Sequence, residues 1–506
     1  MRAAFSGERK SARLLEQCSE MLRDRRLILA SNRGPVEYHI SPDGQLQAGR
    51  GSGGVVTALS TLTSSVDFAW VASAMGEGDR RAAQQAEGGR IRSPLPGQHL
   101  SLRYVVTPRR MYHKFYNVFC NPLLWFLQHY MWSSAYTPNV DDTVYDAWNT
   151  GYVPVNQAFA DAIVEEAKHS VRPPYVMLHD YHLYLTPGMI RSALPEALIQ
   201  HFIHIPWPDA GYWQIIPSFM RRAICEGLCA CDIVGFQTSR DVRSFLQSCE
   251  MFLEGAQVDH TNCTVRLNGR ETAVRCYPLS IDVEEMRRIA DSPRALEHEK
   301  KLRPLLGEKT IVRVDRLEPN KNIVRGFHAY QLLLSRCPEL HGKVKFLAFL
   351  VPSRTHIRQY QRYLEEVDAL VGEINQTFGR EGWQPVTVFY ENNYTQAMAA
   401  MKLYDVLLVN SVIDGMNLVA KEGPVVNTRG GILILSETAG AYAQLQEGAI
   451  GVAPADVEGT AQAMYQAITA SVEERERRAS ILAQEVERED VIHWMARQME
   501  DLKALA

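Results

Sequence analysis

The chain has 506 residues, 46% of them apolar and 22% charged, which is the composition of a globular protein large enough for two or three domains. Its 54 basic and 58 acidic residues give a formal net charge of -4, which argues against a nucleic-acid-binding protein. Nine cysteines without paired or zinc-finger spacing favour reduced thiols in a cytoplasmic protein, and no stretch has the pattern of a secretory signal or a membrane span.

The first half of the chain alternates short apolar runs with longer amphipathic ones. We expect helices at residues 156–168 and 239–252, and strands at "RLILAS", "FAWVASA", "RYVVT", "YVMLHD", "QHFIHIP" and "CDIVGFQT". After the first strand, "GRGSGGVVTALSTL" is typical of a glycine-rich loop that opens a helix. Further along, "VRLNGRETAVRC" predicts a hairpin that turns at Asn268-Gly269.

The same alternation restarts in the second half, with expected strands at "TIVRVD", "VKFLAFLV", "VTVFYE", "DVLLVNS" and "GILILSE". Two such series predict an α/β fold with two doubly wound domains. We place an N-terminal extension at residues 1–26, one domain at 27–280 and a second at 281–480. Residues 481–506 are expected to form a C-terminal helix that packs back on the first domain. The charged tail from Ser471 onward predicts one long amphipathic helix.

In open α/β sheets, ligands bind beyond the carboxyl ends of the strands, so the polar residues at those ends identify candidate sites. Arg33 follows the first strand, and Gly51, Gly53 and Gly54 precede the first helix. Backbone amides in such a loop suit a phosphate, and a guanidinium can bind one bidentately. An ordinary glycine-rich turn between a strand and a helix explains the glycines equally well.

Histidines follow two further strands of the first domain. His179 and His182 belong to "HDYH", and His204 lies in "HIPWP". Packing and capping account for such histidines as readily as ligand binding does. The His-x-x-His spacing is poor support for a metal, because no carboxylate-rich set accompanies it.

The stretch "VRVDRLEPNKN" ends a predicted strand with two cations, Arg316 and Lys321. As a diphosphate clamp, they would stabilise the charge that develops on a leaving nucleoside diphosphate, each contributing about 3–4 kcal/mol in a dry site. As an exposed ion pair with Glu318, Arg316 would contribute at most about 1 kcal/mol. This stretch alone leaves both interpretations open.

A later stretch, "NSVIDGMNLVAKEGPVVN", favours the clamp. Its loop carries Asp414 and Gly415, and a helix is expected to start near Asn417 or Leu418 with free amides for a phosphate or sugar hydroxyl. Glu422 follows within that helix, where a carboxylate could bind a ribose diol. Two carboxylates beside an anion site are hard to explain as packing.

The chain resembles the trehalose-6-phosphate synthases, retaining glycosyltransferases of glycosyltransferase family 20. The resemblance runs from about Leu27 to Leu502, and its motifs are "HDYH", "HIPWP", "DRLEPNKN", "VPSR", "DGMNLVAKE" and "LSETAGA". It implies a GT-B architecture, in which two Rossmann-like domains face each other across a cleft. It also implies transfer of glucose from a nucleoside diphosphate glucose to glucose 6-phosphate, with retention and without a metal or cofactor.

The resemblance also assigns roles, residue by residue. The implied catalytic residues are Arg316, Lys321, His179 and Asp414. The implied donor-binding residues are Gly53, Gly54, Arg316, Lys321, Asp414, Gly415, Met416, Asn417, Leu418 and Glu422. The implied acceptor-binding residues are Arg33, Trp70, Tyr116, Trp125 and Arg354. Among these, His179 is expected near the 6-hydroxyl of the transferred glucose, and the arginines near phosphate.

Several positions depart from the family pattern. Glu318-Pro319-Asn320 stands where Asp-Tyr plus one residue is usual, and Asn322 where glycine is usual. Trp207 replaces a phenylalanine, Ile413 replaces an arginine, and "WNTGY" lacks an acidic residue. Similar departures occur in pseudo-glycosyltransferases that couple a nucleotide-activated cyclitol to an aminocyclitol phosphate.

That coupling reaction is one alternative, and a non-catalytic sugar-phosphate sensor is another, although such a sensor would be expected to lose Arg316 or Lys321. A dehydrogenase is set aside, because no G-x-G-x-x-G with a well-placed acidic residue is present. The sequence leaves the donor base open among uridine, guanosine and adenosine. We expect no nucleic-acid or membrane partner, and a homo-oligomer is compatible with the sequence.

Overall fold

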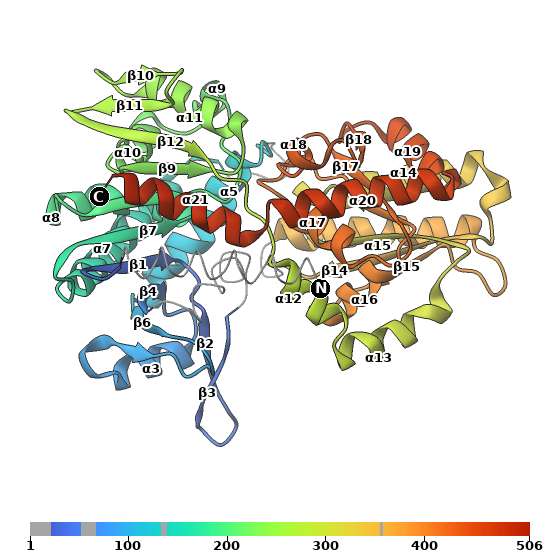
Figure 1. Cartoon of the computed structure of the whole chain (residues 1–506), viewed down its shortest axis with the longest axis horizontal. Coiled ribbons are helices and arrows are strands. Elements are labelled where there is room, and N and C mark those ends of the chain that lie inside the picture. Colours follow the sequence, from blue (N-terminus) through green and yellow to red (C-terminus); the bar gives the residue numbers. More distant parts are fainter. Residues whose placement is uncertain (1–21, 52–66, 133–138, 355–357, 506) are drawn as a thin grey trace. The chain divides into compact units, whose positions relative to one another are not determined.

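The computed structural model describes residues 22–51, 67–132, 139–354 and 358–505. Its internal contacts divide the chain into two compact units. Unit 1 contains the described residues up to Leu279 together with those from Val491 onward, and unit 2 contains Ser280–Asp490. Each unit is built around its own largely parallel sheet with flanking helices, which confirms the predicted α/β class (Figure 1).

Unit 1 contains a ten-stranded sheet in which the strand order reverses direction between β1 and β7, as in doubly wound folds. The order is β10 (Gln257–Asp259), β11 (Thr264–Leu267), β12 (Arg270–Cys276), β9 (Ile233–Phe236), β8 (Leu198–Phe202), β7 (Arg172–His179), β1 (Arg25–Ser31), β4 (Phe68–Ser73), β6 (Leu100–Val105) and β5 (Ile91–Arg92). Pairing is parallel from β12 to β6 and antiparallel at both edges. The predicted hairpin at Asn268-Gly269 is confirmed, and both turn residues have positive φ.

The helices of unit 1 are mostly short, and two π-helical stretches, η2 and η3, each join one α-helix directly to the next. They are α3 (Glu77–Gln85), α4 (Arg109–His113), the π-helix η2 (Lys114–Leu124), α5 (Trp125–Gln128), α6 (Asp142–Ala147), the π-helix η3 (Trp148–Tyr152), α7 (Val153–Ala167), α8 (Thr186–Ala193), α9 (Ala210–Trp213), α10 (Ser218–Leu228), α11 (Ser239–Phe252) and α21 (Val491–Ala504), with 3-10 turns η1 (Glu87–Gly89) and η4 (Tyr181–Leu183). In α11, Thr238 accepts a bond from the Asp241 amide and so caps the helix, which begins and ends as predicted.

Unit 2 contains a six-stranded sheet whose strands all pair in parallel. The order is β15 (Val386–Phe389), β14 (Val344–Val351), β13 (Lys309–Arg316), β16 (Val406–Val409), β17 (Ile432–Ser436) and β18 (Ile450–Val452). Its helices are α12 (Val283–Ala290), α13 (Pro293–Leu302), α14 (Ile323–Arg336), α15 (Arg358–Phe378), α16 (Tyr394–Leu403), α17 (Val419–Val426), α18 (Tyr442–Leu445), α19 (Val457–Thr469) and α20 (Val472–Arg488), with 3-10 turns η5 (Arg303–Leu305), η6 (Pro319–Lys321) and η7 (Pro338–Leu340).

The strands of unit 2 are continuous apolar runs because both faces of the sheet are covered. Successive residues point to opposite faces, so Ile311 belongs to one apolar core and Val312 to the other. Phe346 and Leu347 of the neighbouring strand divide in the same way. The core on each face fixes the sheet and with it the positions of the loops at the strand ends.

One local prediction needs correction, and one hairpin was not predicted. The tail is not one long helix: α20 ends at Arg488 and α21 begins at Val491, because α20 packs in unit 2 and α21 in unit 1. Within unit 1, Trp494 packs edge-on against Phe202, and α21 lies along the sheet (Figure 1). The sequence also gave no prediction for the hairpin of β2 (Val36–Ile40) and β3 (Leu46–Arg50). Its one signal was the Asp43-Gly44 turn between two short runs.

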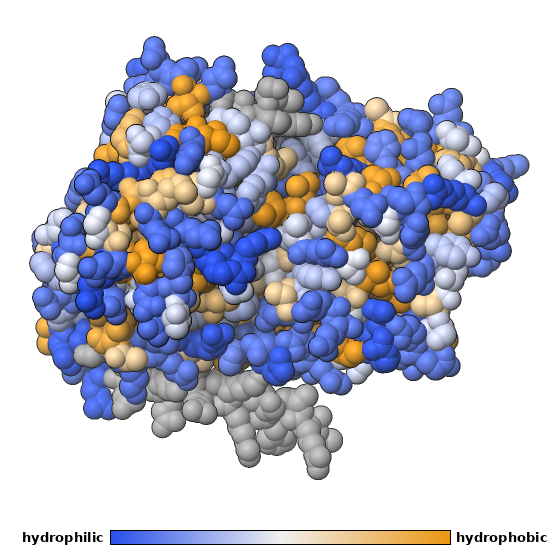
Figure 2. Space-filling model, turned by 90° about the horizontal axis from the view of Figure 1, so that it is seen from above, coloured by the Kyte–Doolittle hydropathy of each residue, from blue (hydrophilic) through white to orange (hydrophobic). Residues whose placement is uncertain are grey.

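The surface is predominantly polar on the face drawn in Figure 2, where apolar residues form small separate groups. Within the described ranges, no helix combines the length and apolar character that crossing a bilayer requires.

Candidate active site

Arg316 and Lys321 lie at the carboxyl end of β13 in unit 2. The Arg316 side chain is 55% exposed, with Nη1 3.2 Å from Oε1 of Glu318. The Lys321 ammonium is nearly buried and forms an ion pair with Asp414 Oδ2. The ion pair that the sequence offered as the alternative to a clamp therefore exists. It is not an exposed pair, however, because Glu318 is completely buried.

Asn322, directly after Lys321, adopts the left-handed conformation with φ 58°. Asparagine tolerates this conformation better than most residues, which accounts for its place where glycine is usual. Its Nδ2 donates to the carbonyl oxygens of Asn410, at 2.9 Å, and Pro454, at 2.7 Å. These bonds fix the turn that presents Lys321 and starts α14.

Arg313 is a buried arginine that the sequence did not single out. Its guanidinium, fully shielded from solvent, donates to Asp315 Oδ2 at 3.0 Å, to the Lys321 carbonyl at 2.9 Å and to Asn410 Oδ1 at 3.1 Å. A Cβ on Gly326 would lie 2.4 Å from Arg313 Nη1, so only glycine leaves room for it. Arg313 thus holds the backbone of the Lys321 turn from within the core of unit 2.

The loop from Asp414 to Leu418 follows β16 and precedes α17. Asn417 has a left-handed φ of 70°, and its Nδ2 donates to Asp414 Oδ2 at 3.1 Å. The amides of Gly440 and Ala441 bind the carbonyl oxygens of Asp414, at 3.1 Å, and Met416, at 2.9 Å. The carbonyl groups are thereby turned toward the "LSETAGA" segment. A Cβ on Gly440 would lie 1.8 Å from the Gly415 oxygen, which explains that glycine.

Glu422 lies in the first turn of α17, as predicted for a helix that begins near Leu418. Tyr394 Oη donates to Glu422 Oε1 at 3.2 Å. Burial raises the pKa of Glu422 to about 7, and the Tyr394 bond opposes this only in part. The carboxyl group therefore exchanges its proton near neutral pH.

Arg354 lies beyond the carboxyl end of β14, next to the end of β13, because the two strands pair in parallel with Arg316 opposite Val351. Its Nη1 donates to Glu318 Oε1 at 3.0 Å and to Tyr360 Oη at 2.7 Å. Its φ of 48° is an unfavourable backbone conformation, of a kind that costs about 1–3 kcal/mol and often occurs at ligand sites.

In unit 1, Arg33 follows β1. Although burial opposes its charge, interaction with the Tyr116 hydroxyl and with Glu37 raises the pKa of the guanidinium. Trp70 is completely buried, and its connection to Arg33 runs through Ser31. Its Nε1 donates to Ser31 Oγ at 2.9 Å, and Ser31 Oγ donates to the Arg33 carbonyl at 2.6 Å. Trp70 thus supports the backbone that carries Arg33.

Tyr116 belongs to a stack of rings. It lies nearly parallel to Tyr112, with centroids 5.6 Å apart, and to His182, with centroids 5.9 Å apart. Trp125, nine residues along the same helical stretch, is buried and stacks on His129 at 4.2 Å. The structure therefore brings Arg33, Tyr116 and Trp70 together through contacts, whereas the contacts described for Trp125 are to other residues.

His179 ends β7 and is completely buried. Its Nδ1 lies 3.1 Å from Nε2 of His204, the histidine of "HIPWP". Its Nε2 has no hydrogen-bond partner among the residues that the structure describes. Burial, reinforced by His204 and His201, holds the pKa of His179 well below its ordinary value, and the pKa of His204 is lowered to about 3. The pair is neutral at physiological pH, with one ring nitrogen left for a ligand.

Gly53 and Gly54 lie outside the described residues, so their predicted role stays a prediction. Gly51 is described and buried, and a Cβ there would lie 2.0 Å from the Gly34 carbonyl oxygen. A cavity of about 300 Å³ lies near the predicted acceptor residues, and Tyr112, the partner of Tyr116 in the stack, contributes to its wall together with Arg80, Arg109 and His113.

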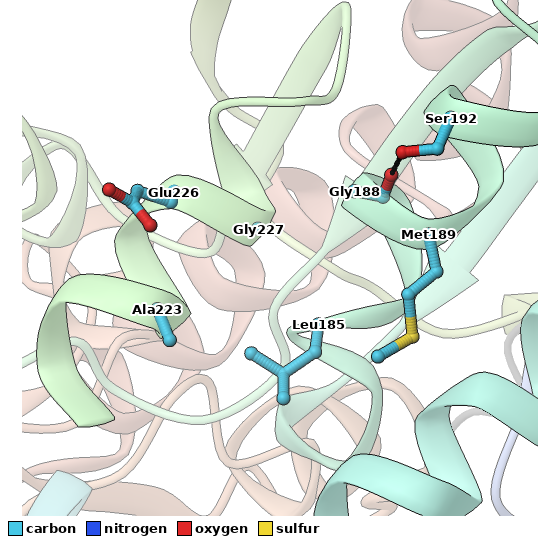
Figure 3. Close-up of a pocket in the computed structure, with 7 residues that line it drawn as sticks. All are labelled: Leu185, Gly188, Met189, Ser192, Ala223, Glu226 and Gly227. Atoms are coloured by element: carbon cyan, nitrogen blue, oxygen red, sulfur yellow. Dashed lines mark hydrogen bonds between the residues drawn. The ribbon is translucent and has the colours of Figure 1, made fainter. Parts of the chain in front are cut away.

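A second cavity, of about 310 Å³, lies between α8 and α10 in unit 1 (Figure 3). Its wall is formed mainly by apolar side chains such as Leu185, Met189 and Ala223. The Ser192 hydroxyl donates to the Gly188 carbonyl at 3.0 Å, and so is already used. This cavity contains none of the predicted site residues and lacks convergent polar groups.

The family model of Glycosyltransferase family 20 matches residues 25–504. The bifunctional trehalose-6-phosphate synthase/phosphatase of Thermoproteus tenax is 34% identical over 93% of this chain and 62% of its own length. The chain thus spans less than two thirds of that relative. A UDP-forming alpha,alpha-trehalose-phosphate synthase of Aspergillus fumigatus is 32% identical, with 93% of this chain and 95% of the relative covered. Validamine 7-phosphate valienyltransferase of Streptomyces hygroscopicus is 29% identical, with 94% of each covered.

Solved structures show the same fold. A trehalose-6-phosphate synthase of E. coli bound with UDP-2-fluoro glucose superposes with a TM-score of 0.79 at 25% identity, over 94% of this chain and 99% of its own. A UDP-forming alpha,alpha-trehalose-phosphate synthase of Burkholderia xenovorans in complex with glucose-6-phosphate gives a TM-score of 0.79 at 26% identity, over 94% and 100%. The predicted two-domain GT-B class is thereby confirmed.

Proposed function

The chain belongs to glycosyltransferase family 20, and on that premise we propose that it transfers glucose from a nucleoside diphosphate glucose to glucose 6-phosphate, giving trehalose 6-phosphate and the nucleoside diphosphate. One observation carries the proposal. At the carboxyl end of the unit 2 sheet, the cations Arg316 and Lys321 lie beside a loop that carries Asp414, and the helix that follows this loop carries Glu422 in its first turn. This is the combination that an anionic leaving group attached to a hydroxyl-rich sugar requires.

Donor binding is assigned to unit 2. Arg316 and Lys321 bind the diphosphate, and the half-exposed guanidinium of Arg316 is accessible to it. Asp414 binds glucose hydroxyls, which compete with its ion pair to Lys321. The amides of Gly415, Met416, Asn417 and Leu418 supply further donors, and Glu422 accepts bonds from the ribose diol. Gly53 and Gly54 complete the donor set in this proposal.

Acceptor binding is assigned to Arg33, Trp70, Tyr116, Trp125 and Arg354. Arg33 and Arg354 bind the phosphate of glucose 6-phosphate, for which guanidinium geometry is suited. Trp70 acts by holding the Arg33 backbone through Ser31. The Nε2 atom of His179, which has no hydrogen-bond partner among the described residues, contacts the transferred glucose near its 6-hydroxyl.

In the proposed reaction, the bond between the anomeric carbon and the β-phosphate oxygen breaks. The anomeric hydroxyl oxygen of glucose 6-phosphate forms a new bond on the same face, and its proton passes to the departing phosphate oxygen. The preplaced charges of Arg316 and Lys321 stabilise the leaving group without reorganising, and the remaining rate enhancement comes from positioning. The proposal needs no metal or cofactor, and this stays a prediction.

We propose uridine as the first donor base to test, since relatives with this architecture are named UDP-forming. The described cysteines are free thiols, which supports the cytoplasm as the site of the reaction.

A second candidate is the coupling of a nucleotide-activated cyclitol to an aminocyclitol phosphate. The observation that favours it is the similarity to validamine 7-phosphate valienyltransferase over nearly the whole chain, together with Ile413 and the "WNTGY" stretch. The intact loop from Asp414 to Glu422 and the acceptor arginines favour the glucosyl transfer.

The test is release of nucleoside diphosphate by the purified full chain, assayed with each nucleotide-glucose donor, with and without glucose 6-phosphate. We expect release that depends on glucose 6-phosphate, and a product whose two anomeric protons show α couplings in its NMR spectrum. Glucose without the phosphate should be a much poorer acceptor.

The same assay separates the alternatives. If no glucose donor supports release but an activated cyclitol with an aminocyclitol phosphate does, the second candidate replaces the first. If neither the glucose donors nor the activated cyclitol support release while glucose 6-phosphate still binds, the non-catalytic sensing role replaces the proposed transfer. The Arg316→Ala variant is the control, because release that persists in it does not come from the proposed site.

A further inference from the structure

Glu318 is the residue through which the two phosphate-binding arginines of unit 2 contact each other. It directly follows β13 yet is completely buried, in a stretch that departs from the family pattern. The parallel pairing of β13 and β14 brings the segments beyond both strand ends together, and the Leu317 amide donates to the Val351 carbonyl at 2.8 Å. Glu318 and Arg354 meet for this reason.

One oxygen of the carboxylate receives three contacts. Oε1 lies 3.2 Å from Arg316 Nη1, and accepts from Arg354 Nη1 at 3.0 Å and from Ser353 Oγ at 2.9 Å. Oε2 has no hydrogen-bond partner in the described part of the chain. A buried carboxylate with all its contacts on one oxygen is not optimised for stability alone, since the second oxygen is desolvated without compensation.

The carboxylate stays ionised. Burial raises the pKa of Glu318, but the charges of Arg316, Arg354 and Lys321 outweigh it and lower the pKa to about 2. The negative charge is therefore present throughout the neutral pH range. It offsets the repulsion between cations that are held close together before any anion is bound.

The two arginines have different proposed ligands, the donor diphosphate for Arg316 and the acceptor phosphate for Arg354. They are held to different degrees: Arg316 is half exposed, whereas Arg354 is largely buried and also donates to Tyr360 Oη at 2.7 Å. Their common contact is Glu318, and a shared anchor makes the orientation of both depend on one side chain.

We propose that Glu318 is a positioning residue for both substrates: its carboxylate holds Arg316 and Arg354 in their binding orientations, so that donor and acceptor affinity depend on the same group. The inference rests on the proposed function and deepens it, by linking the two binding sites through a residue that contacts neither substrate.

The test is the affinity of the Glu318→Gln variant for each ligand separately, measured by calorimetry with UDP alone and with glucose 6-phosphate alone. Glutamine keeps the shape and removes the charge, so we expect both dissociation constants to rise about tenfold, as for loss of a charged hydrogen bond. In steady-state assays, KM for both substrates should rise, whereas Arg354→Lys should raise KM for glucose 6-phosphate only.

Asp405→Asn is the matched control. Asp405 is also a buried carboxylate of unit 2 with two arginine partners, but at the amino end of β16. It is expected to lower stability while leaving both dissociation constants within about twofold, since it touches no proposed ligand group. Glu318→Asp, which keeps the charge but shortens the side chain, serves if Glu318→Gln does not fold, and should also weaken both ligands.

The outcomes are separable. Unchanged affinity for both ligands, or weaker binding of one ligand only, overturns the shared role of Glu318. Equal weakening in Asp405→Asn overturns it as well, because the effect would then follow general destabilisation. If the wild-type protein binds neither ligand and forms no product, the proposed function has failed instead.

Discussion

Unit 2 contains two clusters of buried carboxylate, arginine and lysine side chains that have nearly the same composition. They differ in how fully the carboxylate oxygens are hydrogen-bonded. At the carboxyl end of the sheet, buried Glu318 contacts Arg316 and Arg354, with Lys321 nearby. At the amino end, buried Asp405 contacts Arg429 and Arg475, with Lys309 3.9 Å away. Each is a carboxylate with two arginines and a lysine, so charge alone does not distinguish them.

Their hydrogen bonds do distinguish them. In the Asp405 cluster both carboxylate oxygens are used, with the Thr310 amide on Oδ2 at 2.9 Å and Arg475 on Oδ1 at 3.1 Å. Arg475 also donates from Nε to the Gly430 carbonyl and from Nη2 to the Arg429 carbonyl. In the Glu318 cluster, by contrast, Oε2 has no hydrogen-bond partner within the described ranges, and Arg316 is half exposed.

Unit 1 follows the same rule. Buried Glu166, near the amino ends of its strands, receives bonds from Arg90 and Arg103, and both of its oxygens are engaged. Beyond the carboxyl ends, Nδ2 of Asn32 and Nε2 of His179 are buried, with no partner in the described ranges. These examples contrast carboxylates whose two oxygens are both engaged with polar atoms that have no described partner at the proposed sites. The contrast is not absolute, since Arg26 Nε, close to Glu166, also has no partner among the described residues.

The largest expected effect is a loss of turnover, which should follow changes near Glu318 but not changes in the Asp405 cluster. Arg316→Ala and Lys321→Ala should each lower kcat by at least about a hundredfold, because a preplaced charge on the leaving group is lost. Steady-state kinetics with thermal unfolding as a control check this. Arg475→Ala should lower the unfolding temperature and leave kcat nearly unchanged. Near-normal turnover in both clamp variants would remove the clamp assignment.

The next effect is on stability. Asp405→Asn should lower the free energy of unfolding of unit 2 by about 2–3 kcal/mol, less than for a fully buried pair because Arg429 is partly exposed. Denaturant titration measures this. A loss of stability smaller than that of an ordinary surface substitution would show that the Asp405 cluster has no structural role.

The titration of Glu422 should give a smaller effect, a pH dependence of KM for the donor. The Asp405 cluster should not contribute to this dependence. With its pKa raised to about 7 by burial, Glu422 is protonated below neutrality and accepts ribose hydroxyls poorly. KM for the donor should therefore fall about tenfold as pH rises from 6 to 8. Measurements at saturating glucose 6-phosphate exclude titration of the acceptor. In Glu422→Gln the dependence should vanish, and if it persists, another group is responsible.

The smallest effect tests the support of Arg33 in unit 1. Trp70→Phe removes the bond to Ser31 and should raise KM for glucose 6-phosphate about threefold, the scale of one neutral hydrogen bond. Trp383→Phe is the matched control, since Trp383 is a buried tryptophan of unit 2 whose Nε1 lacks a partner among described residues. Equal KM in wild type and Trp70→Phe would make Trp70 a core residue only.

The sequence by itself determined the alternation of strands and helices, the hairpin at Asn268-Gly269, and the placement of Arg33, His179, Arg316 and Asp414 at strand ends. These follow from periodicity and turn chemistry, which are local properties of the chain. The motifs also identified the family, since their residues and spacing are specific.

Only the tertiary structure decided which of these side chains meet and which atoms remain unused. Lys321 pairs with Asp414, which lies 93 residues away, and His179 with His204, 25 residues away. Arg313 and Glu318 gave no signal as buried anchors, and Trp70 gave none as a core residue. The break between α20 and α21 was equally hidden. Burial and charge pairing depend on what other parts of the chain place nearby, and a local pattern carries no information about that.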